Sequence, residues 1–176
     1  MSEPKTWIVS GIPGSGKTTV ARLLAGTFSK GVHIEGDLVG HAFIISGLVA
    51  PHAEPQEEAH VQLALRRRNI NLLANSFHHA GFTVFIDDVV VSSEILEQYV
   101  ENLEGSLRFV QLCPAVEIAE ARDSARHKQV FHIWKHLQQH LEEMPRSGLW
   151  LDTSTMSPQE TVGNILQRSE EATLRQ

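Results

Sequence analysis

The stretch Gly11-Ile12-Pro13-Gly14-Ser15-Gly16-Lys17-Thr18 follows directly on the apolar run Trp7-Ile8-Val9-Ser10. It matches the phosphate-binding pattern G-x-x-x-x-G-K-[ST] at every specified position. Glycine allows backbone conformations that a side chain would forbid, so successive N–H groups can converge on the oxygens of a phosphate. A helix that begins at the end of the stretch adds unpaired amides and the positive end of its dipole. The sequence therefore predicts a phosphate-binding loop between a strand and a helix.

This loop and the first turn of the next helix contain the residues that we expect to hold a nucleotide. Lys17 can reach the terminal phosphates, and the Thr18 hydroxyl is a candidate ligand for Mg²⁺. The alternative is a glycine-rich turn that matches the pattern by chance. The strand pattern before the loop and the helical pattern after it favour the phosphate site. The expected ATP-binding residues are Gly11, Gly14, Ser15, Gly16, Lys17, Thr18 and Thr19.

The composition limits the class of protein and its partners. The chain has 176 residues, of which 41% are hydrophobic, and this predicts one domain with a buried core. A formal net charge of −6 argues against nucleic acid or a membrane as partner, since phosphate-backbone binders usually carry surplus positive charge. The single cysteine, Cys113, excludes an internal disulfide. Because no basic and apolar leader and no stretch of about 18 apolar residues occurs, we expect a cytoplasmic protein.

Short apolar runs alternate with longer helical patterns, as in parallel strands joined by helices. We expect an α/β fold of three layers with a five-stranded parallel sheet, and ligands at the carboxyl ends of the strands. The polar tail from Ser169 is expected to fray. The expected strands are residues 6–10, 32–35, 82–87, 107–113 and 148–152, and the expected helices are 17–29, 55–80, about 93–103, and two that open at 114 and 157.

Acidic residues follow two strands at the edge where ligands are expected. Asp87 ends the clearest apolar strand, where a P-loop protein needs a carboxylate to hold magnesium directly or through water. Asp37 follows the second strand, where it could accept the proton of a substrate hydroxyl that attacks the γ-phosphorus of ATP. The alternatives are a plain strand-terminal residue for Asp87 and a helix N-cap for Asp37. For Asp88 two roles stay open: a supporting contact at this site, or simply the start of the next loop. Gly11, Asp37, Asp87 and Asp152 should all emerge on one edge of the sheet.

Phosphoryl transfer also needs positive charge on the migrating group. Arg122 and Arg126 lie four apart and share a helix face, so they can act as catalytic cations from a lid over residues 122–146. The alternative is that both arginines are ordinary charged residues on a solvated helix. Arg66-Arg67-Arg68 point in three directions, so at most one or two can face an acceptor pocket, and a solvated face is favoured. The histidines at 132, 136 and 140 could bind a metal ion, but a solvated face is favoured there too.

With these residues placed, residues 5–168 resemble the P-loop small-molecule kinases, a group that includes chloramphenicol phosphotransferase, gluconate and shikimate kinases and zeta-toxin-like kinases. The resemblance rests on the loop at 11–18, on Asp37, on the run Ile86-Asp87-Asp88 and on the arginines at 122 and 126. It implies a sheet order of 2-3-1-4-5 and Mg²⁺-dependent transfer of the γ-phosphoryl group of ATP to a small-molecule hydroxyl. Lys17, Asp37, Arg122 and Arg126 would then be the catalytic residues, with Thr18 and Asp87 at the metal. The resemblance does not identify the acceptor.

One kinase domain would span residues 1–176, with an acceptor-side insertion at about 38–80. The competing hypothesis is a nucleotide-binding regulatory module, or a slow ATPase without a phosphoryl acceptor, in which Asp37 would be dispensable. A GTPase switch is disfavoured because the guanine-reading motif Asn-Lys-x-Asp does not occur in the sequence. Monomer and homodimer are both compatible with the sequence.

Overall fold

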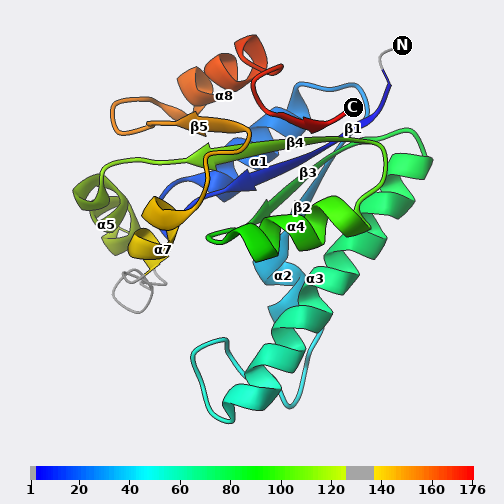
Figure 1. Cartoon of the computed structure of the whole chain (residues 1–176), viewed down its shortest axis with the longest axis vertical. Coiled ribbons are helices and arrows are strands. Elements are labelled where there is room, and N and C mark those ends of the chain that lie inside the picture. The colour runs from blue at the N-terminus through cyan, green and yellow to red at the C-terminus, as the bar shows by residue number, and fades with distance from the viewer. Residues whose placement is uncertain (1–2, 126–136) are drawn as a thin grey trace.

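The computed structural model describes residues 3–125 and 137–176, which form a central sheet with helices on both faces (Figure 1). The strands are β1 (Lys5–Ser10), β2 (Gly31–Glu35), β3 (Thr83–Asp88), β4 (Ser106–Leu112), β5 (Leu149–Leu151) and β6 (Thr173–Arg175). The helices are α1 (Lys17–Gly26), α2 (Gly36–His41), α3 (Gln56–His79), α4 (Ser93–Asn102), α5 (Val116–Ser124), α7 (Leu137–Glu143) and α8 (Pro158–Gln167).

The sheet order β2-β3-β1-β4-β5 confirms the predicted α/β topology, and all four of these strand pairs are parallel. A sixth strand was not predicted. β6 pairs antiparallel with the first half of β4, whereas β5 pairs with its second half, from Val110 to Leu112. The two short strands therefore share one edge of β4.

The expectation of a frayed tail after Ser169 is wrong, because side chains attach this segment to the sheet. Arg108 is buried in β4 and donates hydrogen bonds to the Ser169 carbonyl at 2.6 Å and to the Glu170 carboxylate at 2.8 Å. Arg175 donates to the carbonyls of Val100, Leu103 and Gly105 at the end of α4. The Val100 carbonyl is in the last turn of α4, where carbonyls lack a partner inside the helix, and Leu103 and Gly105 follow this end, so a polar tail gains hydrogen bonds by docking there.

Two hydrophobic clusters cover the two faces of the sheet. The first contains Trp7, Val9 and Phe85 and is covered by α1 and α8. The second contains Ile8 and Ile86 and is covered by α3, α4, α5 and α7. Side chains on successive residues of a strand point to opposite faces, so β1 and β3, buried on both, are continuously apolar up to their polar ends.

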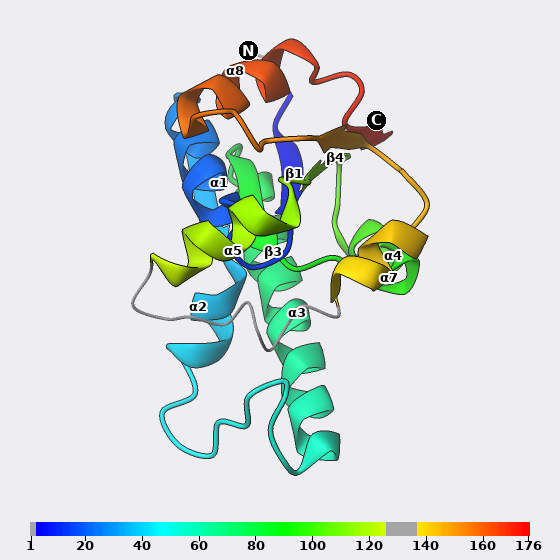
Figure 2. The same cartoon turned by 90° about the vertical axis from the view of Figure 1, so that its left-hand side faces the viewer.

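Helix boundaries differ from the predictions where side chains bond to the backbone. The first helix ends at Gly26 rather than near residue 29, because the Thr27 hydroxyl and amide both bond to the Leu24 carbonyl. At the predicted start of the last helix, Ser157 and Glu160 form a capping box for α8. Around α2 and the start of α3, the chain projects from one end of the sheet, with the segment 42–55 joining them (Figure 2). Within the described ranges no helix is long and apolar enough to cross a membrane.

Candidate active site

The phosphate-binding stretch forms a tight loop between β1 and α1, as predicted. Gly16 is the N-cap of α1 with φ 92°, and no side chain caps the helix, so the amides of its first turn stay available to a ligand. Gly14 has φ 82°, and a Cβ placed on it would lie 2.0 Å from the Ala119 carbonyl oxygen. The loop is thus packed against α5. The Ser15 hydroxyl is buried beside it and has no hydrogen-bond partner among the residues that the structure describes. An uncapped helix N-terminus with a glycine-lined loop fits a bound phosphate.

The parallel sheet brings the predicted ligand edge together. Register pairs Ser10 with Asp88, and Glu35 with Asp87, so the carboxyl ends of β1, β2 and β3 lie at one level. The residues that follow these strands, and Asp152 after β5, therefore share one edge of the sheet. Of the binding residues expected there, Lys17 and Thr18 are half-buried, whereas Thr19 is exposed.

Asp87 is held at this edge by a residue of the neighbouring strand. Its carboxylate is 3% exposed and accepts a hydrogen bond from His33 Nε2 at 2.7 Å. Glu35 lies beside Asp87 in the register, and the pKa of Glu35 is raised by burial first and then by the charge of Asp87. The charge of His33 opposes this shift, as does that of Lys17.

His33 and Glu35 were missed by the reasoning from sequence, which treated β2 only as a strand. A signal was present, since alternate polar residues at the end of an otherwise apolar strand point to one face of the sheet. Among the described residues no group of three or more potential metal ligands is found. Mg²⁺ commonly uses one or two carboxylates and keeps several waters, so its site needs no larger cluster, and the assignment of Thr18 and Asp87 to it stays a prediction.

Asp37 and Asp88 lie on the opposite side of this edge and are joined by Arg66 of α3. Arg66 Nη1 donates to Asp37 Oδ1 at 3.1 Å, and Arg66 Nη2 donates to Asp88 Oδ1 at 2.6 Å. Asp37 is in the first turn of α2 and is 58% exposed, whereas Asp88 is buried. A Cβ on Gly36 would lie 2.8 Å from the Asp87 carbonyl oxygen, so a glycine lets α2 approach the end of β3.

The prediction that the arginine triplet lies on a solvated face is therefore wrong for Arg66, whose side chain is only 10% exposed. The approach of α2 to α3 buries it, and two carboxylates compensate its charge. Arg68 is exposed, in keeping with the prediction that at most one or two of the three face the site. Asp88, whose role the sequence left open, is the last residue of β3 and accepts a hydrogen bond from Arg66.

Arg122 is part of α5 and contacts the loop after β5. Its Nη2 donates to the Thr153 carbonyl at 3.0 Å. Ser154 of the same loop accepts a hydrogen bond from the Ala115 amide at 2.8 Å, so two bonds join this loop to the start and end of α5. Arg126, the second predicted lid arginine, lies outside the described residues, as do the histidines at 132 and 136.

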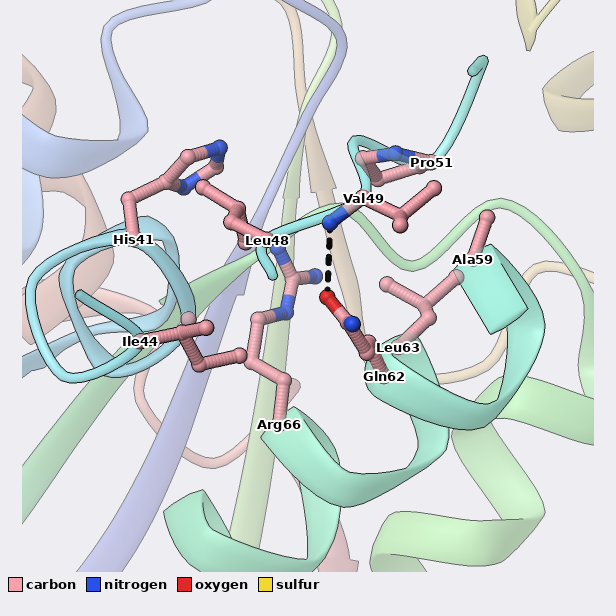
Figure 3. Close-up of a pocket in the computed structure, with 10 residues that line it drawn as sticks. His41, Ile44, Leu48, Val49, Pro51, Ala59, Gln62, Leu63 and Arg66 are labelled. Carbon is pink, nitrogen blue, oxygen red and sulfur yellow. Dashed lines mark hydrogen bonds between the residues drawn. The ribbon is translucent and has the colours of Figure 1, made fainter. Parts of the chain in front are cut away.

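A pocket opens next to Asp37 between α2, the segment 42–55 and α3 (Figure 3). Gly40 and His41 line it from α2, one turn after Asp37. Gln62 closes one side, donating to the Gly47 carbonyl at 2.8 Å and accepting from the Val49 amide at 2.9 Å. The other lining residues are Ile44, Leu48, Pro51, Ala59, Leu63 and Arg66.

The sequence matches the family described as chloramphenicol phosphotransferase-like protein over residues 5–170. The chain belongs to this family. Its membership confirms the resemblance to P-loop small-molecule kinases and supports phosphotransfer to small molecules in general. No curated protein matches the sequence significantly.

Solved structures with the same fold include several P-loop kinases. A sugar kinase from Janibacter sp. HTCC2649 is 20% identical with a TM-score of 0.73, over 96% of each chain. A gluconokinase from Sinorhizobium meliloti 1021 is 18% identical with a TM-score of 0.61, over 98% of this chain and 95% of the other. The Deinococcus radiodurans tunicamycin resistance protein is 16% identical with a TM-score of 0.64, over 98% of each chain. At these identities the likeness to the solved structures shows the fold alone.

Proposed function

We propose that this family member transfers the γ-phosphoryl group of ATP to a hydroxyl of a small molecule, with Mg²⁺. The loop of residues 11–18 and Thr19 would hold the nucleotide, with Lys17 on the terminal phosphates. Thr18 and Asp87 would hold the metal ion, which supplies charge neutralisation at the β- and γ-phosphates when it is bound. In this proposal residues 1–176 act as one kinase domain. A cytoplasmic setting, with no nucleic-acid or membrane partner, belongs to the same proposal.

Asp37 is the proposed acceptor-side acid, and its 58% exposed carboxylate can be reached by a hydroxyl. It would accept the proton from that hydroxyl as the oxygen attacks phosphorus. Arg122 and Arg126 would stabilise negative charge on the migrating group from a lid over residues 122–146. Residues 38–80 would form the acceptor side.

The observation that carries this proposal is that Glu35, next to Asp87 in the strand register, is close enough to Lys17 and Asp37 to be influenced by both charges. The positive charge of Lys17 and the negative charge of Asp37 both act on the pKa of Glu35. The phosphate-binding lysine and the proposed base are therefore within electrostatic reach of one side chain. Transfer of a phosphoryl group requires such proximity, because catalysis of this reaction is largely positioning and charge stabilisation.

The proposal is tested by screening acceptors for ATP-dependent gain of one phosphate by mass spectrometry. Sugars, nucleosides, aminoglycosides and phenicol antibiotics make up the library. With an acceptor in hand, Asp37→Asn should lower turnover by about 100-fold or more and leave ATP affinity unchanged. Glu101→Gln, which removes an exposed carboxylate on α4, is the matched control and should have no effect. Repeated failure of the screen, with ATP hydrolysis unchanged in Asp37→Asn, would favour the regulatory module or slow ATPase.

The role of Arg122 has its own test. Arg122→Ala should lower turnover more than it lowers ATP affinity if its charge acts mainly in the transition state. Equal losses in turnover and in ground-state binding of ATP would instead indicate a structural role for Arg122, through its hydrogen bond to the Thr153 carbonyl.

A further inference from the structure

The solvent face of α3 carries an apolar stripe. Val61, Leu65 and Leu72 are 56%, 44% and 60% exposed, and they lie on the side of the helix opposite the buried Ala59 and Ile70. Single apolar residues are ordinary on a protein surface, whereas large apolar side chains that follow one another along one helix face mark a contact surface. The stripe is therefore a candidate interface.

The residues of this face have the spacing of a seam between two helices. Glu58, Val61, Leu65, Arg68 and Leu72 are separated by steps of three, four, three and four residues, which keeps their side chains on one face. Glu58 and Arg68 are exposed like the apolar members. Val61 and Leu65 are thus flanked by an acidic residue on one side and a basic residue on the other.

Neither of these two charges is compensated by an ion pair within residues 3–125 and 137–176. The Glu58 carboxylate accepts a hydrogen bond from the Gln62 amide at 2.7 Å and keeps its charge. Glu57 adds a second acidic side chain in the same first turn of α3. At the other end of this face His79 is already paired with Glu104. The face is therefore acidic at its start and basic at Arg68.

A second copy of the same helix complements this pattern. When two copies of α3 lie antiparallel about a two-fold axis beside residue 63, Glu58 lies opposite the partner's Arg68. Val61 then lies opposite the partner's Leu65. Two-fold symmetry repeats both contacts, so four apolar side chains are enclosed between two ion pairs. Such a face is complementary to itself in both shape and charge.

Other arrangements of the two helices lack this complementarity. A second antiparallel register, shifted by one step of the seam, places Leu72 on the partner's Val61 but leaves Arg68 on the partner's Leu65. Parallel helices in register place Glu58 against the partner's Glu58. Unpaired or like charges at a contact disfavour both of these arrangements. Charge therefore selects the antiparallel register centred on residue 63.

The shape of the molecule allows two chains to meet in this way. The first half of α3 extends beyond the end of the sheet (Figures 1 and 2), and the proposed contact is centred in that half. Two chains can overlap these halves with their sheets at opposite ends. Arg66, which binds Asp37, is on the other side of α3 and largely buried, so the contact does not include the candidate active site.

We propose that this chain forms an antiparallel homodimer through the solvent face of α3, with Val61 and Leu65 at its centre and Glu58 bound to the partner's Arg68. The contact uses one helix face of each chain and is smaller than the interface of a permanent dimer, so association is weak and reversible. The dimer does not rest on the proposed phosphoryl transfer, and its tests need no turnover.

The interface is tested by sedimentation velocity from about 10 µM to about 500 µM protein, the range in which a small interface associates. The mass should rise with concentration toward that of two chains. Leu65→Glu puts a charge at the centre and should weaken association by about tenfold or more. Ile118→Glu changes an exposed apolar residue of α5 and is the matched control, with no effect expected. A monomer at every concentration, or a dimer that Leu65→Glu does not weaken, would overturn the proposal.

The ion pairs are tested by reversing their charges one at a time and together. Glu58→Arg and Arg68→Glu should each weaken association by about fivefold, because each sets like charges against one another. The double variant restores opposite charges across the two-fold axis and should regain the affinity of the unsubstituted protein. Circular dichroism checks that these surface variants are folded. A double variant no tighter than the single ones would overturn the assigned register.

Disulfide trapping gives an independent readout of the register. A mixture of Val61→Cys and Leu65→Cys chains should form a cross-linked dimer under mild oxidation, because these positions lie opposite each other. Either variant alone should not, since its two cysteines are offset by about 6 Å along the helix axes. Cross-linking in the separate variants but not in the mixture would contradict the proposed register.

Discussion

His33 Nε2 lies 2.7 Å from Asp87 Oδ2, so a side chain of β2 holds the carboxylate at the end of β3. Both groups are largely buried, at 16% and 3% exposure. A histidine in this position restricts the rotamers of Asp87 and leaves Oδ1 outside the bond. The candidate metal-associated carboxylate is therefore oriented before any ligand arrives.

Replacing His33 should weaken binding of Mg-ATP more than binding of ATP alone. His33→Ala removes the partner that orients Asp87, and losses of this kind commonly reach about 10-fold in metal affinity. Titration calorimetry with and without Mg²⁺ measures the difference. His79→Ala removes an exposed histidine paired with Glu104 and should change neither value. An equal loss with and without the metal ion would argue against an orienting role for His33.

Gly14→Ala should impair nucleotide binding and destabilise the fold. A Cβ at Gly14 would lie 2.0 Å from a backbone oxygen of α5, and φ is 82°, so the loop must move. We expect a loss of about 1–3 kcal/mol in the free energy of unfolding, measured in urea, with ATP binding lost by calorimetry. Gly163→Ala is the control, since Gly163 lies in α8 with open space around it, and it should stabilise by about 0.5–1 kcal/mol. ATP binding that survives in Gly14→Ala would contradict the assigned role of the loop.

Arg175→Ala should destabilise the protein although the residue is next to the end of the sequence. Its guanidinium satisfies three carbonyls at the end of α4, and each net hydrogen bond to a charged group is worth about 1.5–3 kcal/mol where it is shielded from water. Because Arg175 is partly exposed, we expect a total near 1–3 kcal/mol by urea unfolding. Arg168→Ala breaks a solvent-exposed pair with Glu171 and should leave the free energy of unfolding nearly unchanged. Equal effects of the two substitutions would refute the docking role of Arg175.

Cys113 should react slowly with alkylating reagents at pH 8. Burial raises the pKa of its thiol to about 11, and the charge of Asp152 adds to the shift while Arg146 opposes it. Only the thiolate reacts, and a pKa above the ambient pH keeps the thiol protonated. Iodoacetamide labelling of the folded chain should be about 100-fold slower than in urea and should rise roughly tenfold per pH unit toward pH 11. Equal rates in folded and unfolded protein would show that the thiol is not perturbed.

The P-loop, the parallel sheet and the ligand edge could be predicted because each depends on local pattern. Apolar runs of strand length, glycine spacing and a helical pattern after the loop need no knowledge of distant residues. Register of parallel strands then brings Asp37 and Asp87 to the same edge. β6 could not be predicted in this way, because three residues are too few to carry a periodic signal and the strand depends on bonds from Arg108 and Arg175 to distant carbonyls.

Within the site, the arginine triplet also combines a feature that local pattern predicts with one that depends on packing. Helical spacing places Arg66, Arg67 and Arg68 on different faces but cannot tell which of them is buried. That choice depends on how α2 approaches α3 through Gly36 and Gly40, where an added Cβ would collide with the Asp87 carbonyl of β3 or make a tight contact with Arg66. Family membership confirms the predicted resemblance, whereas the roles of Asp37, Arg122 and Arg126 stay predictions.

By itself the sequence determined that a glycine-rich loop joins a strand to a helix, and it predicted a phosphate site there, since backbone geometry at consecutive residues creates such a site. Only the tertiary structure decided which side chains come together around Asp37. Asp37, Arg66, Asp88 and Tyr99 come from four separate elements, and hydrogen bonds between them exist only once α2, α3 and α4 pack against the sheet. Contacts between residues so far apart in the chain depend on packing, which no local pattern records.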